Sequence, residues 1–119
     1  MNQEQLYEAL NREASLPDIQ KYIKQVIDIR GFGNQSTQAA LLLLLEEVGE
    51  LAKAVRKNTQ GMSVDTKRIN NYDTIESEVA DVLIVLISIC NNLGIDLFDA
   101  LKEKEKVNCS RTWRINDTR

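Results

Sequence analysis

The stretch 73–93 constrains the fold more than any other part of the sequence. It contains no proline, glycine, lysine or arginine, and apolar residues cover nearly all sides of it at helical spacing. A helix of this composition is expected at the centre of a helical protein. We expect its polar strip to be buried against another helix or a pocket; at about 100° per residue the strip comprises Thr74, Ser77, Glu78, Asp81, Ser88 and Asn92.

The rest of the composition also favours helices. The 119 residues include one proline and five glycines, and 43% are hydrophobic, which is enough for one domain with a real core. Apolar periodicity predicts helices at 2–14, 17–30, 37–57, 73–93 and 97–110, with a loop at 58–71. The predicted fold class is therefore all-α, a four-helix bundle preceded by a short extra N-terminal helix.

Local signals set the predicted helix boundaries. Ser15 and Asp18 have the spacing of a capping box, and Ser36 and Asp96 are expected to cap the helices that follow them. Gly94 is expected to end the helix 73–93. The long helix 37–57 carries its apolar stripe at Leu41, Leu44, Leu45, Val48, Leu51, Ala52 and Val55.

The charged and reactive residues exclude several classes of function. The net charge of −3 argues against general nucleic-acid binding. The absence of histidine excludes imidazole catalysis, imidazole metal ligands and the Glu-x-x-His motif of di-iron bundles. Any metal would be bound by oxygen, which favours Mg²⁺, Mn²⁺ or Ca²⁺. Cys90 and Cys109 lack zinc or redox spacing, and Cys90 is expected to be a core thiol.

The sequence shows no secretory signal and no apolar segment of membrane length. The leucine run 41–45 is too short to cross a bilayer, and Glu46 and Glu47 follow it at once. We therefore expect no membrane partner and a cytoplasmic location in which the thiols stay reduced.

Two pairs of carboxylates stand out, Glu47 with Glu50 and Glu78 with Asp81. On a helix, a spacing of three residues brings the second side chain within about 60° of the first. Either pair alone is also typical of solvated helix charges that pair with nearby lysines. The second pair, however, lies in an apolar helix that offers no cation. Two facing pairs would concentrate negative charge that a hard divalent cation could neutralise.

Taken in order, the two motifs resemble those of the MazG-like, all-α nucleoside triphosphate pyrophosphohydrolases, whose signature is ExxE, a gap and ExxD. Residues 51–77 form the gap here, and the segments 45–52, 78–83 and 93–97 also resemble the family. The resemblance covers residues 17–113. It implies an N-terminal helical extension at 1–16, a catalytic helical domain at 17–113 and a C-terminal tail at 114–119.

The resemblance implies hydrolysis of a nucleoside triphosphate to the monophosphate and pyrophosphate, in nucleotide-pool housecleaning. Glu47, Glu50, Glu78 and Asp81 would hold Mg²⁺, for which Mn²⁺ could substitute, and no side-chain nucleophile would be needed. Either Glu47 or Glu50 could act as general base toward water, and the choice stays open. The family also implies a homodimer or homotetramer, in which oligomerisation completes the bundle.

Lys104, Asn108 and Arg111 are spaced by four and three residues at the end of the chain's last predicted helix. The family has a similar Lys-x-x-x-Asn-x-x-Arg stretch, which implies that Lys104 and Arg111 bind phosphate oxygens and that Asn108 orients them. The alternative is that these cations complement the dipole at a helix C-terminus. Asn92 is likewise open to two interpretations, as a residue that binds substrate or orders a metal ligand, or as a helix cap.

Two other functions stay open. One is a non-catalytic helical oligomerisation or regulatory module that retains the fold. The other is a dUTP- or dCTP-preferring relative from the same helical superfamily, which would differ in base choice and not in chemistry. The complete set of four carboxylates argues against the inactive module.

Overall fold

The computed structural model describes residues 1–59 and 74–111. This part of the chain is all-helical and contains no strand, which confirms the predicted class. The predicted tail 114–119 and residues 60–71 of the predicted loop lie outside the described residues. The five helices are α1 (Gln3–Ala9), α2 (Leu16–Ile29), α3 (Thr37–Thr59), α4 (Ile75–Leu93) and α5 (Leu97–Cys109).

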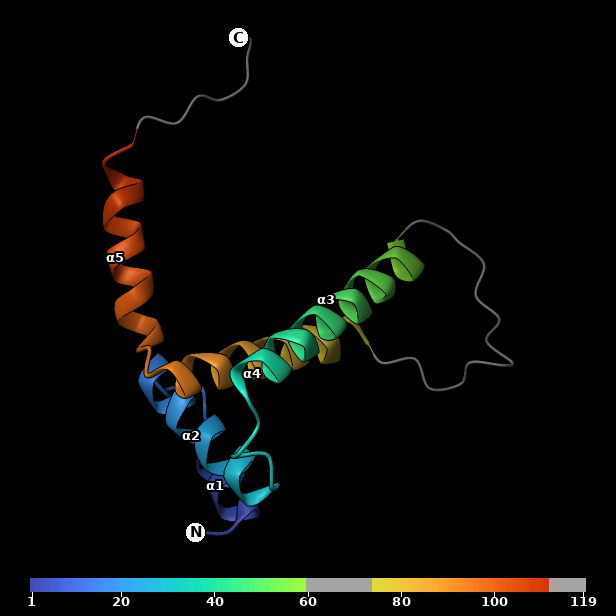
Figure 1. Cartoon of the computed structure of the whole chain (residues 1–119), viewed down its shortest axis with the longest axis vertical. Helices are drawn as coiled ribbons and strands as arrows, with labels where there is room; N and C mark the ends of the chain where they lie inside the picture. Colours follow the sequence, from blue (N-terminus) through green and yellow to red (C-terminus); the bar gives the residue numbers. More distant parts are fainter. Residues whose placement is uncertain (60–73, 112–119) are drawn as a thin grey trace, which may run out of the picture.

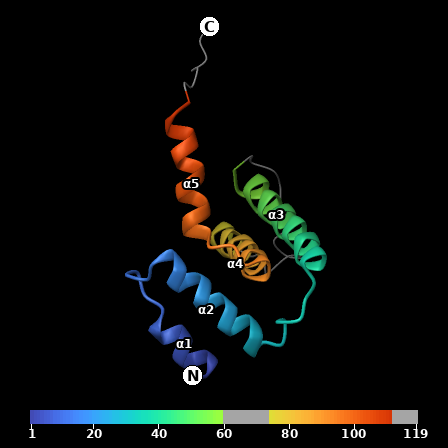
Figure 2. The same cartoon turned by 60° about the vertical axis from the view of Figure 1, so that its left-hand side comes forward.

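Helix α4 occupies the centre of the arrangement (Figure 1). It packs against α3 along one side and against α2 on another, while α2 also contacts α1 and α5. Figure 2 shows α4 between α2 and α3, with α5 starting near α2 and α4 and then extending away from them. The axes of α4 and α5 meet at 97°. One chain therefore forms an α3–α4 hairpin supported by α2, and it does not close a four-helix bundle by itself.

The core lies where α2 meets α4. Val26 of α2 and Ile87 of α4 are fully buried, and Ile23 and Cys90 lie beside them. Full burial of an aliphatic side chain of this size contributes about 1.5–3 kcal/mol relative to exposure. Cys90 is buried and free, as expected of a core thiol, whereas Cys109 is free and exposed.

The face that α3 turns toward α4 differs from the predicted stripe. Its most buried residues are Ala40 and Ala54, which are 1% and 6% exposed. Alanine has no side chain beyond Cβ, so these two positions let α3 approach α4 closely. Five of the seven residues of the apolar stripe are exposed in the single chain: Leu41, Leu45, Val48, Ala52 and Val55.

The expectation of a buried α4 holds only in part. Glu78 and Val85 are buried on one side of the helix and Ile87 is buried on the opposite side, but Val79, Leu83, Leu86 and Leu93, which lie between these two sides, are exposed. The helices that the structure describes leave these apolar side chains uncovered. Among the described helices, none is long and apolar enough to cross a membrane alone, and α4 and α5 meet the criteria only as a bent pair.

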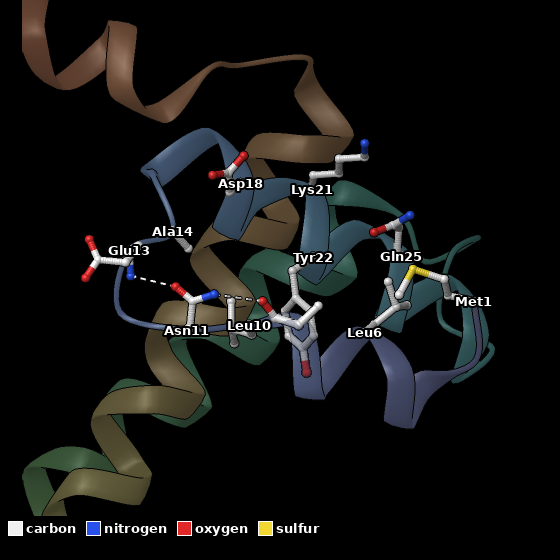
Figure 3. Close-up of a pocket in the computed structure, with 11 residues that line it drawn as sticks. Met1, Leu6, Leu10, Asn11, Glu13, Ala14, Asp18, Lys21, Tyr22 and Gln25 are labelled. Atoms are coloured by element: carbon white, nitrogen blue, oxygen red, sulfur yellow. Dashed lines mark hydrogen bonds between the residues drawn. The ribbon is translucent and has the colours of Figure 1, made fainter.

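Helix α1 is shorter than the predicted helix 2–14, because a local turn competes with it. The side-chain amide of Asn11 donates to the carbonyl of Ala9 at 3.2 Å, and its Oδ1 accepts from the amide of Glu13 at 2.8 Å. Such bonds give the backbone partners outside a helix. Figure 3 shows this turn beside Tyr22, at the edge of a shallow pocket of about 380 Å³. The pocket contains none of the predicted site residues.

The predicted capping box begins α2. The Ser15 hydroxyl accepts from the Asp18 amide at 3.2 Å, and the Asp18 carboxylate accepts from the Ser15 amide at 3.0 Å. The bond from the Ser15 backbone, followed by the bond to its side chain, lowers the pKa of Asp18 below its ordinary value. Ser36 and Asp96 also cap their helices as predicted, and Gly94 ends α4 with a left-handed φ of 69°.

We predict that Ser15→Ala destabilises the protein by about 1 kcal/mol, the usual cost of losing an N-cap hydroxyl. The pKa of Asp18 should rise only in part, because the Ser15 backbone bond remains. A lowered folded-state pKa adds stability above the unfolded-state value and loses it as the pH falls through the folded-state value. The stability difference between the two proteins should therefore narrow in acid.

Urea denaturation across a pH series and NMR titration of the Asp18 carboxyl would measure both effects. Ser110→Ala is the matched control, because the Ser110 hydroxyl donates to the Val107 carbonyl at the other end of a helix. An Asp18 pKa that is identical in wild type and Ser15→Ala would contradict the capping interpretation.

Candidate functional site

Three of the four predicted metal ligands converge between α3 and α4. Glu47 of α3 and Glu78 and Asp81 of α4 each contribute one carboxylate oxygen, and these oxygens lie within 4.8 Å of one another. Glu78 and Asp81 project together because of their spacing on α4. Glu47 reaches them because it lies on the inward face of α3, together with Ala40 and Ala54.

This carboxylate cluster is partly shielded from water. Glu78 is 4% exposed and its Oε2 atom is buried, while Glu47 and Asp81 are half-buried. Removing charged groups from water is costly, and carboxylates this close repel one another. An ion with a preference for hard oxygen ligands offsets both costs. The donor set therefore fits a divalent cation such as Mg²⁺ or Mn²⁺.

Glu50, the fourth predicted ligand, does not join the cluster. It is exposed and lies about 60° around α3 from Glu47, toward the cations at the helix end. There it acts on Lys57, whose pKa is lowered by partial burial, then by Lys53 and Arg56, and is partly restored by Glu50. Glu50 thus lies at the edge of the site, and its predicted roles stay predictions.

The three residues predicted to bind phosphate lie apart from the cluster within one chain. Asp81 is about 18 Å from the C-terminal end of α4, and α5 leaves that end at 97°. Lys104 and Arg111 are exposed, while Asn108 is half-buried and donates to Glu105 at 2.7 Å. Their spacing along the last helix agrees with the prediction, but a single chain does not bring them to the carboxylates.

Asn92 also lies away from the cluster, about 16 Å beyond Asp81 along α4. It lines a small polar pocket with Lys24, Asp28 and Ser88, among other residues. The C-cap position of α4 belongs to Gly94. A role for Asn92 at the metal therefore has no support from its position, and contact with a bound substrate stays a prediction.

Sequence reasoning missed one polar residue of structural weight, Gln20. It is 7% exposed and hydrogen-bonds to both α4 and the start of α5. The available signal was a glutamine on the helical face that otherwise carries Leu16, Ile23 and Ile27. A polar side chain at such a position is normally buried only where it has hydrogen-bond partners.

The part of the chain that forms the carboxylate cluster also matches a known protein family. The family model of the MazG nucleotide pyrophosphohydrolase domain matches residues 35–110. The uncharacterized protein YpjD of Bacillus subtilis (strain 168) is 33% identical over 88 residues, which cover 74% of this chain and 78% of that protein. The dATP/dGTP diphosphohydrolase of Cyanophage S-2L is 34% identical over 74 residues, covering 62% of this chain and 55% of the phage protein. No solved structure gives a significant match.

The matched region contains α3, α4 and α5, and with them both carboxylate pairs and the carboxylate cluster. It leaves out α1, α2 and Arg111. The extent of the family match and the similarity to the Bacillus protein confirm what the two motifs indicated: the chain belongs to the MazG nucleotide pyrophosphohydrolase domain family.

Proposed function

We propose that this protein hydrolyses a nucleoside triphosphate to the monophosphate and pyrophosphate with a divalent cation held by Glu47, Glu78 and Asp81. The observation that carries the proposal is the convergence of these carboxylates within 4.8 Å on helices that match the family. Mg²⁺ is the proposed ion and Mn²⁺ its substitute, because both accept carboxylate oxygens. The proposed setting is cytoplasmic removal of surplus or non-standard nucleotides.

The division of labour follows from the positions of the side chains. The cation, when bound, supplies positive charge that offsets the charge of the phosphate oxygens during hydrolysis. Glu50 is the better candidate for general base than Glu47, because a carboxylate outside the cluster keeps its oxygens available for a proton from water. Lys104 and Arg111 would hold phosphate oxygens, with Asn108 orienting them.

We propose that the chain forms oligomers, because a single chain leaves apolar sides of α3 and α4 exposed. The outer sides of α3 and α4 expose several large apolar side chains, and exposed apolar patches often mark protein–protein interfaces. Gly49 lies beside these side chains, with open space where a Cβ would stand, so another backbone could approach closely. We propose that copies of this chain cover these sides in a homodimer or homotetramer, within which Lys104 and Arg111 reach the triphosphate. The exposed residues are Leu41, Leu45, Val48, Val55, Val79, Leu83 and Leu86.

The cluster should make the protein's thermal stability depend on divalent cations. A ligand that binds the folded state raises the melting temperature by mass action, so millimolar Mg²⁺ or Mn²⁺ should stabilise the wild type. Glu78→Gln should lose this response, and without metal it should melt no lower than wild type because a repulsive charge is gone. Thermal circular dichroism with metal and with EDTA measures the effect.

Glu76→Gln is the matched control for that experiment, since Glu76 is an exposed carboxylate in the first turn of the same helix. It should keep the wild-type response to metal. A Glu78→Gln protein that Mg²⁺ stabilises as much as wild type would refute the assignment of the cluster.

Activity is tested by pyrophosphate and monophosphate release from a panel of canonical and modified NTPs and dNTPs. dATP and dGTP come first, because the phage relative is named for them. We expect release with Mg²⁺ or Mn²⁺ and none with EDTA. Release of orthophosphate instead would rule out pyrophosphohydrolysis. No turnover of any nucleotide, with stabilisation by Mg²⁺ intact, would favour the non-catalytic module.

The same assay tests the residues. Asp81→Asn should lower kcat by more than about 100-fold, and Glu50→Gln should do so to a similar degree if it is the base. Both variants should keep the wild-type helical circular-dichroism signal. Glu46→Gln, an exposed neighbour on α3, should retain wild-type turnover. Near-wild-type rates in Asp81→Asn would show that the reaction occurs elsewhere.

The oligomer is tested by sedimentation equilibrium. We expect a dimer or tetramer for wild type and dissociation for Leu45→Glu, because a charge on the outer side of α3 would be buried on association. Tyr7→Glu, which changes an exposed apolar residue of α1, is the control and should leave the mass unchanged. A monomeric wild type at micromolar concentration would overturn this part of the proposal.

A further inference from the structure

One polar side chain is buried where α2, α4 and the start of α5 meet. The side-chain amide of Gln20 donates to Oδ1 of Asn91 at 3.1 Å and to the carbonyl of Ile95 at 3.0 Å. Its Oε1 accepts from the backbone amide of Leu97 at 2.6 Å. Asn91 returns a bond from Nδ2 to the Gln20 carbonyl at 3.1 Å. These hydrogen bonds offset the cost of burying the polar side chain of Gln20.

The Gln20 bonds hold both sides of the corner between α4 and α5. Gly94 ends α4 and Asp96 caps α5, so the direction of the chain changes within these residues. Gln20 binds Ile95 just before the cap and Leu97 just after it. The Leu97 amide belongs to the first turn of α5, where donors lack a partner within the helix. Gln20 thereby fixes the direction in which α5 begins.

Within residues 1–59 and 74–111, little else is seen to fix that direction. Helix α5 has no buried residue, and its apolar side chains Phe98, Leu101 and Val107 are exposed. It extends about 20 Å from the corner, so small rotations there become large displacements further along. A rotation of about 20° would move Lys104 by about 4 Å. Phosphate binding by a positioned cation does not tolerate such a shift.

We propose that Gln20 is a positioning residue for the triphosphate. It touches no substrate, but it sets the direction of α5 and thereby the place of Lys104 and Arg111. Asn91 is its counterpart on α4. This inference rests on the proposed function, and it assigns a role to a residue of α2, which lies outside the region that the family model matches.

The first test is the kinetics of Gln20→Leu, which removes the three hydrogen bonds of the Gln20 side chain at the corner. We expect KM for the triphosphate to rise by about fivefold or more while kcat changes by less than about twofold. The Mg²⁺-dependent rise in melting temperature should persist, because the carboxylate cluster lies at the other end of α4. Gln25→Leu makes the same change on the exposed side of α2 and is the matched control.

A double-mutant cycle separates positioning from general loss of stability. In a chain that already carries Lys104→Ala and Arg111→Ala, KM should be raised, and Gln20→Leu should raise it no further if it acts through these cations. Multiplication of the two effects would overturn the proposal. So would a Gln20→Leu protein whose KM equals that of wild type.

A conservative variant keeps the test decisive if Gln20→Leu does not fold. Gln20→Asn keeps the amide and adds no charge, but its side chain is one methylene shorter and reaches Asn91, Ile95 and Leu97 less well, so its KM should lie between those of wild type and Gln20→Leu. Hydrogen exchange at the Leu97 amide should quicken in the order wild type, Gln20→Asn, Gln20→Leu. The absence of wild-type turnover would refute the proposed function and this role with it. Wild-type turnover without a KM effect at Gln20 would refute the role alone.

Discussion

The close approach of α3 to α4 is the contact on which the candidate site depends. Ala40 and Ala54 lie on the inward face of α3, and Glu47 stands seven residues from each. Because the flanking alanines have small side chains, Glu47 lies between the two helices, close to Glu78 and Asp81. Apolar residues at these positions would pack without any charge penalty. Placing three carboxylates between α3 and α4 therefore lowers stability but provides a set of oxygen ligands, as is common at functional sites.

Local signals in the sequence predicted most of the helices and the pairing of Glu78 with Asp81 on α4. Capping residues marked the starts of α2, α3 and α5, and the spacing of Glu78 and Asp81 placed them together on α4 without any knowledge of packing. The inward face of α3 was not predictable in this way, because its leucines outnumber its alanines and hydrophobicity favours the leucine side. Which side turns inward is decided by how closely two helices can approach, and a single sequence does not display that distance.

The same limit applies to α4. An apolar helix indicates that something covers it, but the pattern does not distinguish another part of the chain from another copy. In this structure α2 and α3 cover different sides of α4, one with Ile87 and one with Glu78, and Val79 and Leu83 between them face outward. The continuous apolar pattern thus combines surfaces that other helices cover with one that the single chain leaves exposed. The early end of α1 has a more local cause, since the Asn11 turn offers the backbone bonds that compete with a helix.

The position of α5 keeps apart the two kinds of charge that the proposed reaction needs. These are the carboxylates that would hold the cation and the basic side chains that would bind phosphate. A lysine within about 4 Å of the cluster would pair with the carboxylates and compete with both the cation and the phosphate. The 97° corner keeps Lys104 away from the carboxylates of its own chain, so within one chain the two sets do not neutralise each other. That separation is useful only if the corner angle is reproducible. An otherwise unburied α5 obtains a reproducible angle from α2, through the buried amide of Gln20.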